Sequence, residues 1–205
     1  MIAIFDYGAG NLQSVKNTLD AIGASYELTR DSAGLRRASK IILPGVGHFG
    51  QMMRTLDDLG VRETLVERIR AGVPFFGICL GLQALFTSSE EAPGERGLGI
   101  FEGTVARFQA GGLQSQERIP HMGWNQVHQR RETSLLRGTG DSPFLYFAHS
   151  YYCPVVPATA ATCDYIVPYT AVLEQANVSG VQFHPEKSGA IGQTIVRNFI
   201  ENGSC

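Results

Sequence analysis

Residues 75–83 read FFGICLGLQ, and this stretch decides the fold class because one element changes into another within it. Residues 73–78 are predicted as a short buried strand, and residues 80–87 as the start of a helix. Gly77 and Gly81 bracket the turn between them, as in the G-x-S-x-G elbow that presents a nucleophile, with Cys79 in place of serine. Glycines suit this turn because it is tight and brings the helix close to the strand.

Cys79 has two interpretations on spacing alone. Free cysteines are among the most buried residue types, so a structural cysteine of the core is the ordinary one. A thiol at a helix N-terminus, however, faces the positive end of the helix dipole, which favours the nucleophilic thiolate. The spacing does not decide between a core cysteine and a nucleophile.

The predicted elements around this stretch alternate as in an α/β fold. Strands at 2–6, 25–29 and 40–43 alternate with helical patterns at 11–22 and at 50–70, the second interrupted near Gly60. After Gly99, strands are predicted at 100–108, 124–128, 144–147, 165–174 and 178–183, with a helix at 189–202. We expect one domain, residues 1–205. Its fold should be flavodoxin-like and doubly wound, with a mostly parallel central sheet, helices on both faces and an additional antiparallel portion in the second half.

Composition excludes several classes of function. The chain has 205 residues and a net charge of -2, with no basic patch for nucleic acid and no apolar run of the ~20 residues that a membrane span needs. Its N-terminus lacks the basic segment of a signal peptide. The cysteines have neither zinc-site nor disulfide-framework spacing, so we expect no metal and a reducing, cytoplasmic location. They are Cys79, Cys153, Cys163 and Cys205.

Glycine-rich turns follow the predicted strands at 2–6 and 40–43, besides the Cys79 turn. They read YGAGN from Tyr7 and PGVG from Pro44. In a doubly wound sheet, ligands bind beyond the carboxyl ends of the strands, so these turns should meet at one edge. YGAGN lacks the G-x-G-x-x-G spacing of a dinucleotide site, so no cofactor is predicted.

A thiol nucleophile needs a base, and that base needs an orienting group. Among the histidines, His184 in VQFHPEKS is best placed, because it leaves a strand end and Glu186 follows two residues later. A carboxylate this close can hold the imidazole tautomer. A surface turn would also explain His-Pro-Glu alone, but its combination with the cysteine elbow favours catalysis. We interpret His149 as a core histidine.

GICLGLQ and QFHPEKS together resemble the class I glutamine amidotransferases, whose triad is Cys-His-Glu. DYGAGNLQSV, LPGVGHF, PHMGWNQV and FAHSYY further resemble the glutaminase subunits of imidazole glycerol phosphate synthases, from histidine biosynthesis. The motifs run from Asp6 to Ser188. Glutaminases of anthranilate, guanylate and carbamoyl phosphate synthesis share the triad motifs. YGAGN and PHMGWN are therefore the motifs that distinguish the imidazole glycerol phosphate synthase subunits from these other glutaminases. One departure is Ile166, where the resemblance leads us to expect glycine.

The resemblance implies a site for glutamine with no cofactor. Cys79 would attack the carboxamide, His184 would transfer protons and Glu186 would orient His184. The oxyanion donors would be the Leu80 N–H and, after a flip of its loop, the Val46 N–H. The residues that would hold glutamine are Gly47, Gln83, Ser150 and Tyr151.

The resemblance also implies a heterodimer with a (β/α)8-barrel cyclase subunit that receives the ammonia. Trp124 is the only tryptophan, and tryptophan is enriched at interface hot spots as well as common in cores. The residues whose positions would face the cyclase are Tyr7, Asn11, Met122, Trp124, Asn125, Tyr146 and Lys187.

Alternative functions stay open at this point. A non-enzymatic flavodoxin-like thiol sensor would use Cys79 without His184 or Glu186. A cysteine peptidase would share the elbow, although the QFHPE spacing and the lack of a peptide-binding signature argue against it. A glutaminase of another complex, of the anthranilate or guanylate type, is the alternative within the family.

Overall fold

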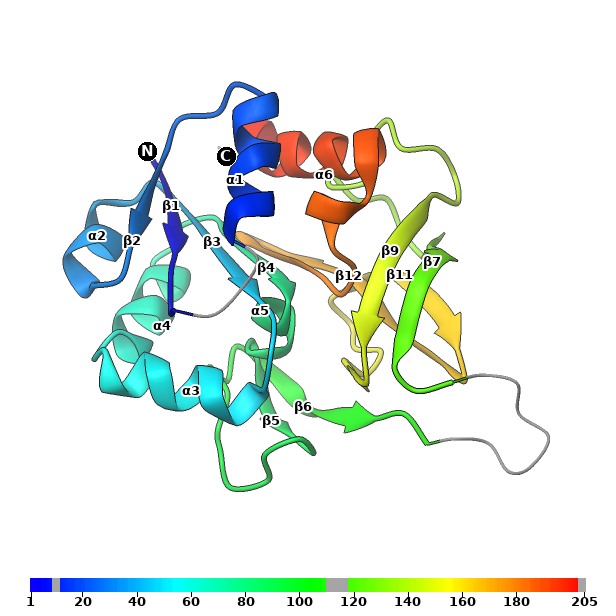
Figure 1. The fold of residues 1–205 in the computed structure, drawn as a ribbon, viewed down its shortest axis with the longest axis horizontal. Coiled ribbons are helices and arrows are strands. Elements are labelled where there is room, and N and C mark those ends of the chain that lie inside the picture. Colours follow the sequence, from blue (N-terminus) through cyan, green and yellow to red (C-terminus); the bar gives the residue numbers. More distant parts are fainter. Residues whose placement is uncertain (9–11, 110–117, 203–205) are drawn as a thin grey trace.

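The computed structural model describes residues 1–8, 12–109 and 118–202 (Figure 1). The first half alternates strands and helices: β1 (Ile2–Phe5), α1 (Leu12–Ala21), β2 (Tyr26–Thr29), α2 (Ser32–Arg37), β3 (Lys40–Gly45), α3 (Phe49–Asp58), α4 (Arg62–Arg70), β4 (Phe75–Cys79) and α5 (Leu80–Gln83). The second half is mostly strands: β5 (Phe86–Ser89), β6 (Phe101–Arg107), β7 (His121–Gln126), β8 (His128–Gln129), β9 (Phe144–His149), β10 (Tyr151–Tyr152), β11 (Thr159–Tyr165), β12 (Val167–Gln175), β13 (Val178–Val181), η1 (Pro185–Lys187) and α6 (Gly189–Asn202).

The central sheet has the strand order β2-β1-β3-β4-β13-β12-β11-β8. Neighbours from β2 to β13 pair in parallel, whereas β12, β11 and β8 continue the sheet antiparallel. The parallel part has the flavodoxin-like order, because the chain adds β2 outside β1 before it returns to β3 on the other side. Both the doubly wound parallel sheet and its antiparallel extension were predicted, and both are confirmed.

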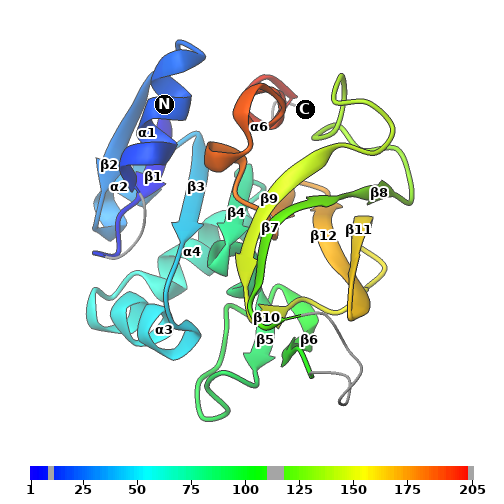
Figure 2. The ribbon, with the colours of Figure 1, turned by 45° about the vertical axis from the view of Figure 1, so that its right-hand side comes forward.

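Helices cover the two faces of this sheet because its central strands are apolar on both sides. Every residue of β1, β3, β4 and β13 is buried. Ala3 and Phe5 belong to the core under α2, α3 and α4, while Ile2 and Ile4 belong to the core under α1 and α6. Figures 1 and 2 show these two helix groups on opposite sides of the sheet.

Smaller sheets complete the second half of the chain. One has the order β10-β6-β5, and the other is the β7–β9 hairpin, which lies beside η1 and β11 (Figure 2). Within the described residues, no helix combines the length and the apolar character that crossing a membrane requires.

The helix predicted at residues 80–87 is wrong beyond its first turn. α5 ends at Gln83, and Phe86–Ser89 form strand β5. Phe86 pairs with Phe101 on β6, and the Thr87 hydroxyl donates to the Gly103 carbonyl at 2.7 Å. These partners are distant in sequence, so the apolar pattern of Leu80, Ala84 and Leu85 could not reveal them.

Candidate active site

Cys79 occupies a strained elbow between β4 and α5. Its backbone has φ +53° and ψ −106°, a conformation that L-residues rarely adopt outside functional turns. The glycines on either side are required by contact: a Cβ on Gly77 would lie 2.5 Å from the Gly81 carbonyl oxygen, and one on Gly81 would lie 1.9 Å from that of Leu43. The G-x-C-x-G spacing therefore reflects close packing of the turn against its own strand and against β3.

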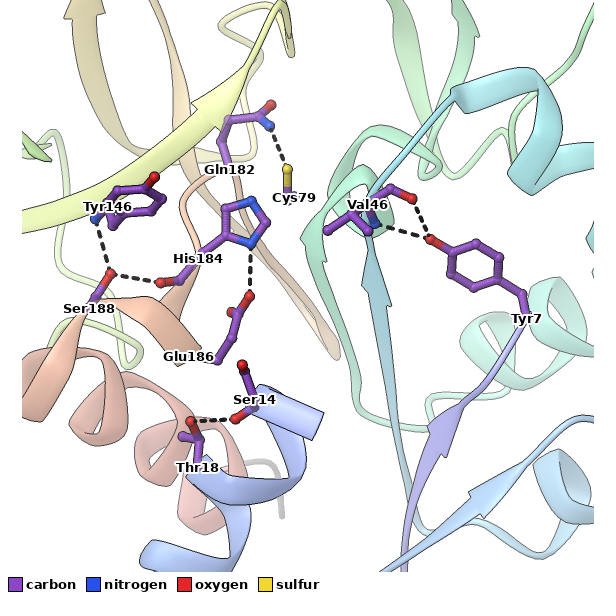
Figure 3. A network of polar contacts seen from close by, with 10 residues as sticks. All are labelled: Tyr7, Ser14, Thr18, Val46, Cys79, Tyr146, Gln182, His184, Glu186 and Ser188. Carbon is purple, nitrogen blue, oxygen red and sulfur yellow. Dashed lines mark hydrogen bonds and ion pairs between the residues drawn. The ribbon is translucent and has the colours of Figure 1, made fainter. Parts of the chain in front are cut away.

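His184 reaches the same sheet edge because β13 pairs in parallel with β4, with Val181 opposite Ile78. Its backbone N–H donates to the Tyr146 carbonyl at 2.8 Å, which fixes the chain as it leaves β13. The His184 Nδ1 lies 2.8 Å from Glu186 Oε1, and both side chains are buried (Figure 3). The Ser188 hydroxyl donates to the His184 carbonyl at 2.7 Å. The structure thus brings Cys79, His184 and Glu186 to one edge, where Glu186 contacts the imidazole and Tyr146 and Ser188 hold the His184 backbone.

The imidazole of His184 favours its charged form. Burial alone lowers the pKa of His184, but the charge and hydrogen bond of Cys79, followed by those of Glu186, outweigh it and raise the pKa to about 10. The charged imidazole thus lies between the Cys79 sulfur and the Glu186 carboxylate. Such an arrangement can activate a sulfur nucleophile and transfer a proton.

Gln182 is a neighbour of Cys79 that the sequence analysis missed. Its buried side-chain amide donates to the Cys79 sulfur at 3.6 Å. The Gln83 amide donates to Gln182 Oε1 at 3.3 Å and to the Tyr151 carbonyl at 2.9 Å. A glutamine just after a strand gives no local signal of function, because its contact with Cys79 depends on the neighbouring strand β4.

A pocket of about 240 Å³ opens above Cys79. All the residues expected to hold glutamine line it, together with both expected oxyanion donors: Val46, Gly47, Leu80, Gln83, Ser150 and Tyr151. His149 also lines it, and burial lowers the pKa of this histidine to about 3, as suits the predicted core residue. Glu91 adds a carboxylate that the sequence analysis missed; its Oε2 accepts from the Phe49 N–H at 2.7 Å. Among the described residues, no group of His, Cys, Asp or Glu could hold a metal ion.

The PGVG turn, which begins within the end of β3, forms hydrogen bonds with Tyr7. The Val46 N–H donates to the Tyr7 hydroxyl at 3.0 Å, and this hydroxyl donates to the Val46 carbonyl at 2.9 Å (Figure 3). Leu80 begins α5, where backbone N–H groups have no partner within the helix. Of the two expected oxyanion donors, the one on Val46 is therefore occupied.

Three of the seven expected interface residues, Met122, Trp124 and Tyr146, share one face of the β7–β9 hairpin. Trp124 pairs with Tyr146 across the hairpin, and Met122 and Trp124 are 65% and 55% exposed. The Lys187 ammonium lies 5.5 Å from the centre of the Tyr146 ring. Phe144, 55% exposed, belongs to the same surface and was missed. We call Met122, Trp124, Phe144 and Tyr146 the hairpin face.

The other expected interface residues are placed differently. The Asn125 side chain turns to the opposite side of the hairpin, where its amide donates to the Asp164 carbonyl at 3.1 Å. Tyr7 is only 4% exposed, so it offers little surface to a partner in this structure. Asn11 lies outside the described residues.

The fold and this sheet edge define an α/β protein with a cysteine elbow of amidotransferase type, and the comparisons agree. The family model for glutamine amidotransferase class-I matches residues 3–202. A crystal structure described as a glutamine amidotransferase, 20% identical, matches with a TM-score of 0.76 over 98% of each chain, which shows the same fold. The chain belongs to the class-I glutamine amidotransferase family.

Within that family its relatives are more specific. The chain is 47% identical to "Imidazole glycerol phosphate synthase subunit HisH" of Methanothermobacter thermautotrophicus, over 98% of both proteins. It is 42% identical to the protein of the same name from Deinococcus radiodurans, over 97% of this chain and 92% of the relative. The branch of the family is therefore that of the HisH subunits of imidazole glycerol phosphate synthase.

Proposed function

We propose that this chain hydrolyses the side-chain amide of glutamine, with Cys79 as nucleophile, His184 as proton carrier and Glu186 as the group that orients His184. The observation that carries the proposal is the buried contact of 2.8 Å between His184 Nδ1 and Glu186 Oε1, on an imidazole whose other partner is Cys79. A thiol sensor or a core cysteine would need no such oriented base.

The chemistry follows from these groups in two halves. The Cys79 sulfur attacks the amide carbon, His184 gives its proton to the departing nitrogen, and ammonia leaves a glutamyl thioester on Cys79. His184, now neutral, then takes a proton from water as the water attacks the thioester. Glutamate departs, and the thiolate and imidazolium are restored. Each tetrahedral intermediate carries an oxyanion, for which the Leu80 N–H and a reoriented Val46 N–H are the proposed donors.

The pocket suits the rest of the glutamine molecule. Backbone groups of Gly47, Ser150 and Tyr151, with the Gln83 amide, would bind polar atoms of the substrate, since all of them line the pocket. The Glu91 carboxylate would attract the α-ammonium group of glutamine, because it supplies negative charge to the pocket wall.

The ammonia would pass to a (β/α)8-barrel cyclase subunit in a heterodimer. Support comes from the names of the relatives, which describe a subunit of a synthase, and from the hairpin face with its exposed Trp124. Met122 both lines the pocket and is exposed on this face, so the docked partner would border the site. Lys187 and Asn11 extend the proposed contact set, whereas Asn125 and Tyr7, as placed in this structure, do not face the partner. A reducing compartment such as the cytoplasm suits a free thiol at Cys79.

The test is glutamate production by purified Cys79→Ala protein in the presence of the cyclase subunit. Replacing the sulfur removes the covalent route, so hydrolysis should fall to background, while cyclase reaction driven by added ammonium should survive. Cys163→Ala is the matched control, because this cysteine is buried away from the pocket lining. Near-normal glutamate production by Cys79→Ala would overturn the assignment.

A further inference from the structure

Tyr7 follows β1 and places one hydroxyl against two consecutive peptide groups of the PGVG turn. The Val46 nitrogen belongs to the peptide between Gly45 and Val46, and the Val46 carbonyl to the next peptide. The hydroxyl accepts from the first at 3.0 Å and donates to the second at 2.9 Å. Its single proton is used on the carbonyl, so the Val46 N–H must point at Tyr7 for both bonds to form.

This orientation directs the Val46 N–H away from Cys79. In Figure 3, Val46 lies between Cys79 and Tyr7, and both dashed bonds run to the Tyr7 side. Val46 and Cys79 line the pocket, whereas Tyr7 does not. Burial, the largest cause, raises the pKa of Tyr7 to about 12, so the hydroxyl keeps the proton that the second bond requires.

The chain around Val46 is built so that this peptide can turn. Gly45 is the register partner of Cys79 on the neighbouring strand, which places the Gly45–Val46 peptide next to the elbow. Gly47 has φ +101°, and a Cβ there would meet no atom within 4 Å. Neither glycine carries a side chain that would oppose rotation of the Gly45–Val46 peptide. Such a rotation would turn the Val46 N–H from the Tyr7 side toward the Cys79 sulfur.

We propose that Tyr7 is a positioning residue whose hydroxyl latches the Val46 peptide away from the oxyanion position and so limits the glutaminase rate of the isolated chain. The inference rests on the proposed function, in which the Val46 N–H is an oxyanion donor. Tyr7 itself touches no reacting atom. It acts by fixing the resting state of the turn, and a cyclase partner that favours the rotated turn has to break both of its hydrogen bonds.

The size of the effect follows from what Tyr7→Phe removes. Two neutral hydrogen bonds to one peptide segment are lost, while the ring remains to fill its place. Together they correspond to a shift of about 5- to 30-fold in the equilibrium between the two orientations. The kcat of the isolated chain should rise by that factor with KM little changed, because the rotated N–H acts on the transition state.

The experiment compares wild type, Tyr7→Phe and Tyr7→Met, each alone and with saturating cyclase subunit. Alone, both variants should exceed wild type; with cyclase, all three should converge, so the stimulation by cyclase shrinks. Tyr26→Phe is the matched control, because the Tyr26 hydroxyl bonds to Asp20 at the amino end of the parallel strands, away from the site. Its loss should change the rate neither alone nor with cyclase. Thermal unfolding verifies that each variant is folded.

Amide hydrogen exchange of Val46 measures how strongly Tyr7 holds the Val46 N–H, and it does so without any turnover. Exchange at Val46 should accelerate in Tyr7→Phe relative to the amides of β3, and not in Tyr26→Phe. Unchanged exchange, or faster exchange with an unchanged or lower kcat in the isolated chain, would overturn the latch. Failure of the proposed function would be a different result: glutamine hydrolysis would persist in Cys79→Ala, both with Tyr7 and with Tyr7→Phe.

Discussion

At the scale of single residues, His184 and Glu186 have unequal tasks although they touch. In the proposed mechanism His184 gives and receives protons, whereas Glu186 holds the tautomer and favours imidazolium through Oε1. The other oxygen of Glu186, Oε2, is buried without a hydrogen-bond partner among the described residues. The Glu186 carboxylate therefore interacts mainly with His184.

We expect His184→Ala to lower kcat more than Glu186→Gln does. Loss of the proton carrier should cost on the order of 10⁴-fold, whereas the glutamine keeps an acceptor for Nδ1 and should cost roughly 10²- to 10³-fold. Steady-state glutamate production with saturating cyclase measures both, with Cys163→Ala as a folded control. A Glu186→Gln enzyme slower than His184→Ala would contradict these roles.

The raised pKa of His184 also makes stability depend on pH. Because the folded protein holds the proton to about pH 10 and the unfolded chain releases it near 6.5, the charged imidazole stabilises the fold below pH 6.5. That contribution should decline as pH rises from 6.5 through 10. Urea unfolding of wild type and His184→Gln should show a difference in unfolding free energy that narrows over this range. A difference that stays constant, or widens, would contradict the imidazolium.

At the scale of elements, the hairpin between β11 and β12 turns at Ile166, where the resemblance led us to expect glycine. Ile166 has φ +60° between the paired residues Tyr165 and Val167. A β-branched residue in this conformation is strained, by about 1–2 kcal/mol. Its side chain packs partly against the core, which offsets some of that cost.

Comparing Ile166→Gly with Ile166→Ala separates the strain from the packing. Both variants lose the side chain, but only glycine relieves the backbone, so we expect the glycine variant to be more stable than the alanine variant by about 1 kcal/mol. Ala176 is exposed and has φ +52°. Ala176→Gly therefore tests the relief of backbone strain without any loss of side-chain packing. Urea unfolding measures both pairs, and an alanine variant as stable as the glycine variant at 166 would show that the turn is not strained.

Elements with a strong local pattern could be predicted from the sequence, and those defined by distant partners could not. The elbow was predicted because its glycines are required by contacts within a few residues and with one neighbouring strand. β5 was mistaken for helix because Phe86 owes its conformation to Phe101. β11 was missed because TAATCDY has no clear alternation and carries Ala160, Ala161 and Asp164, which are poor strand formers; α2 was missed because SAGLRR is only six residues long.

The same distinction applies to the candidate site. Cys79, His184 and Glu186 lie in recognisable motifs, so their meeting followed from the parallel order of the strands. Gln182 and Glu91 belong to the site only through tertiary contacts, with Cys79 and with the pocket wall. The bond between Tyr7 and Val46 likewise joins two turns from separate strands, and no spacing within either turn indicates it.

At the scale of the whole molecule, the hairpin face borders the pocket, and in the proposed complex this arrangement would link partner binding to ammonia release. Met122 belongs to both, and the β9 residue Tyr146 donates its backbone N–H to the Ser188 hydroxyl at 3.0 Å, which in turn bonds to His184. A subunit seated on this face would therefore contact elements that position His184 and would cover the route by which ammonia leaves.

We expect the isolated chain to be a poor glutaminase that the cyclase activates. One of the two proposed oxyanion donors, the Val46 N–H, is bonded to Tyr7, and losing one such donor costs roughly 10²- to 10³-fold in rate. The measurement is glutamate production by the chain alone, with cyclase, and with cyclase plus its nucleotide substrate or a product analogue. Equal rates under all three conditions would contradict the coupling.

Trp124→Ala shows whether the hairpin face carries this activation. A hot-spot tryptophan contributes about 2–4 kcal/mol, so the variant should need about 30- to 1,000-fold more cyclase for half-maximal stimulation, with an unchanged rate when alone. Leu28→Ala, an exposed apolar residue on the far edge strand β2, is the control and should respond like wild type. If Trp124→Ala is stimulated at the wild-type cyclase concentration, the partner docks elsewhere. If it binds cyclase normally but is not stimulated, Trp124 transmits the signal instead of supplying affinity.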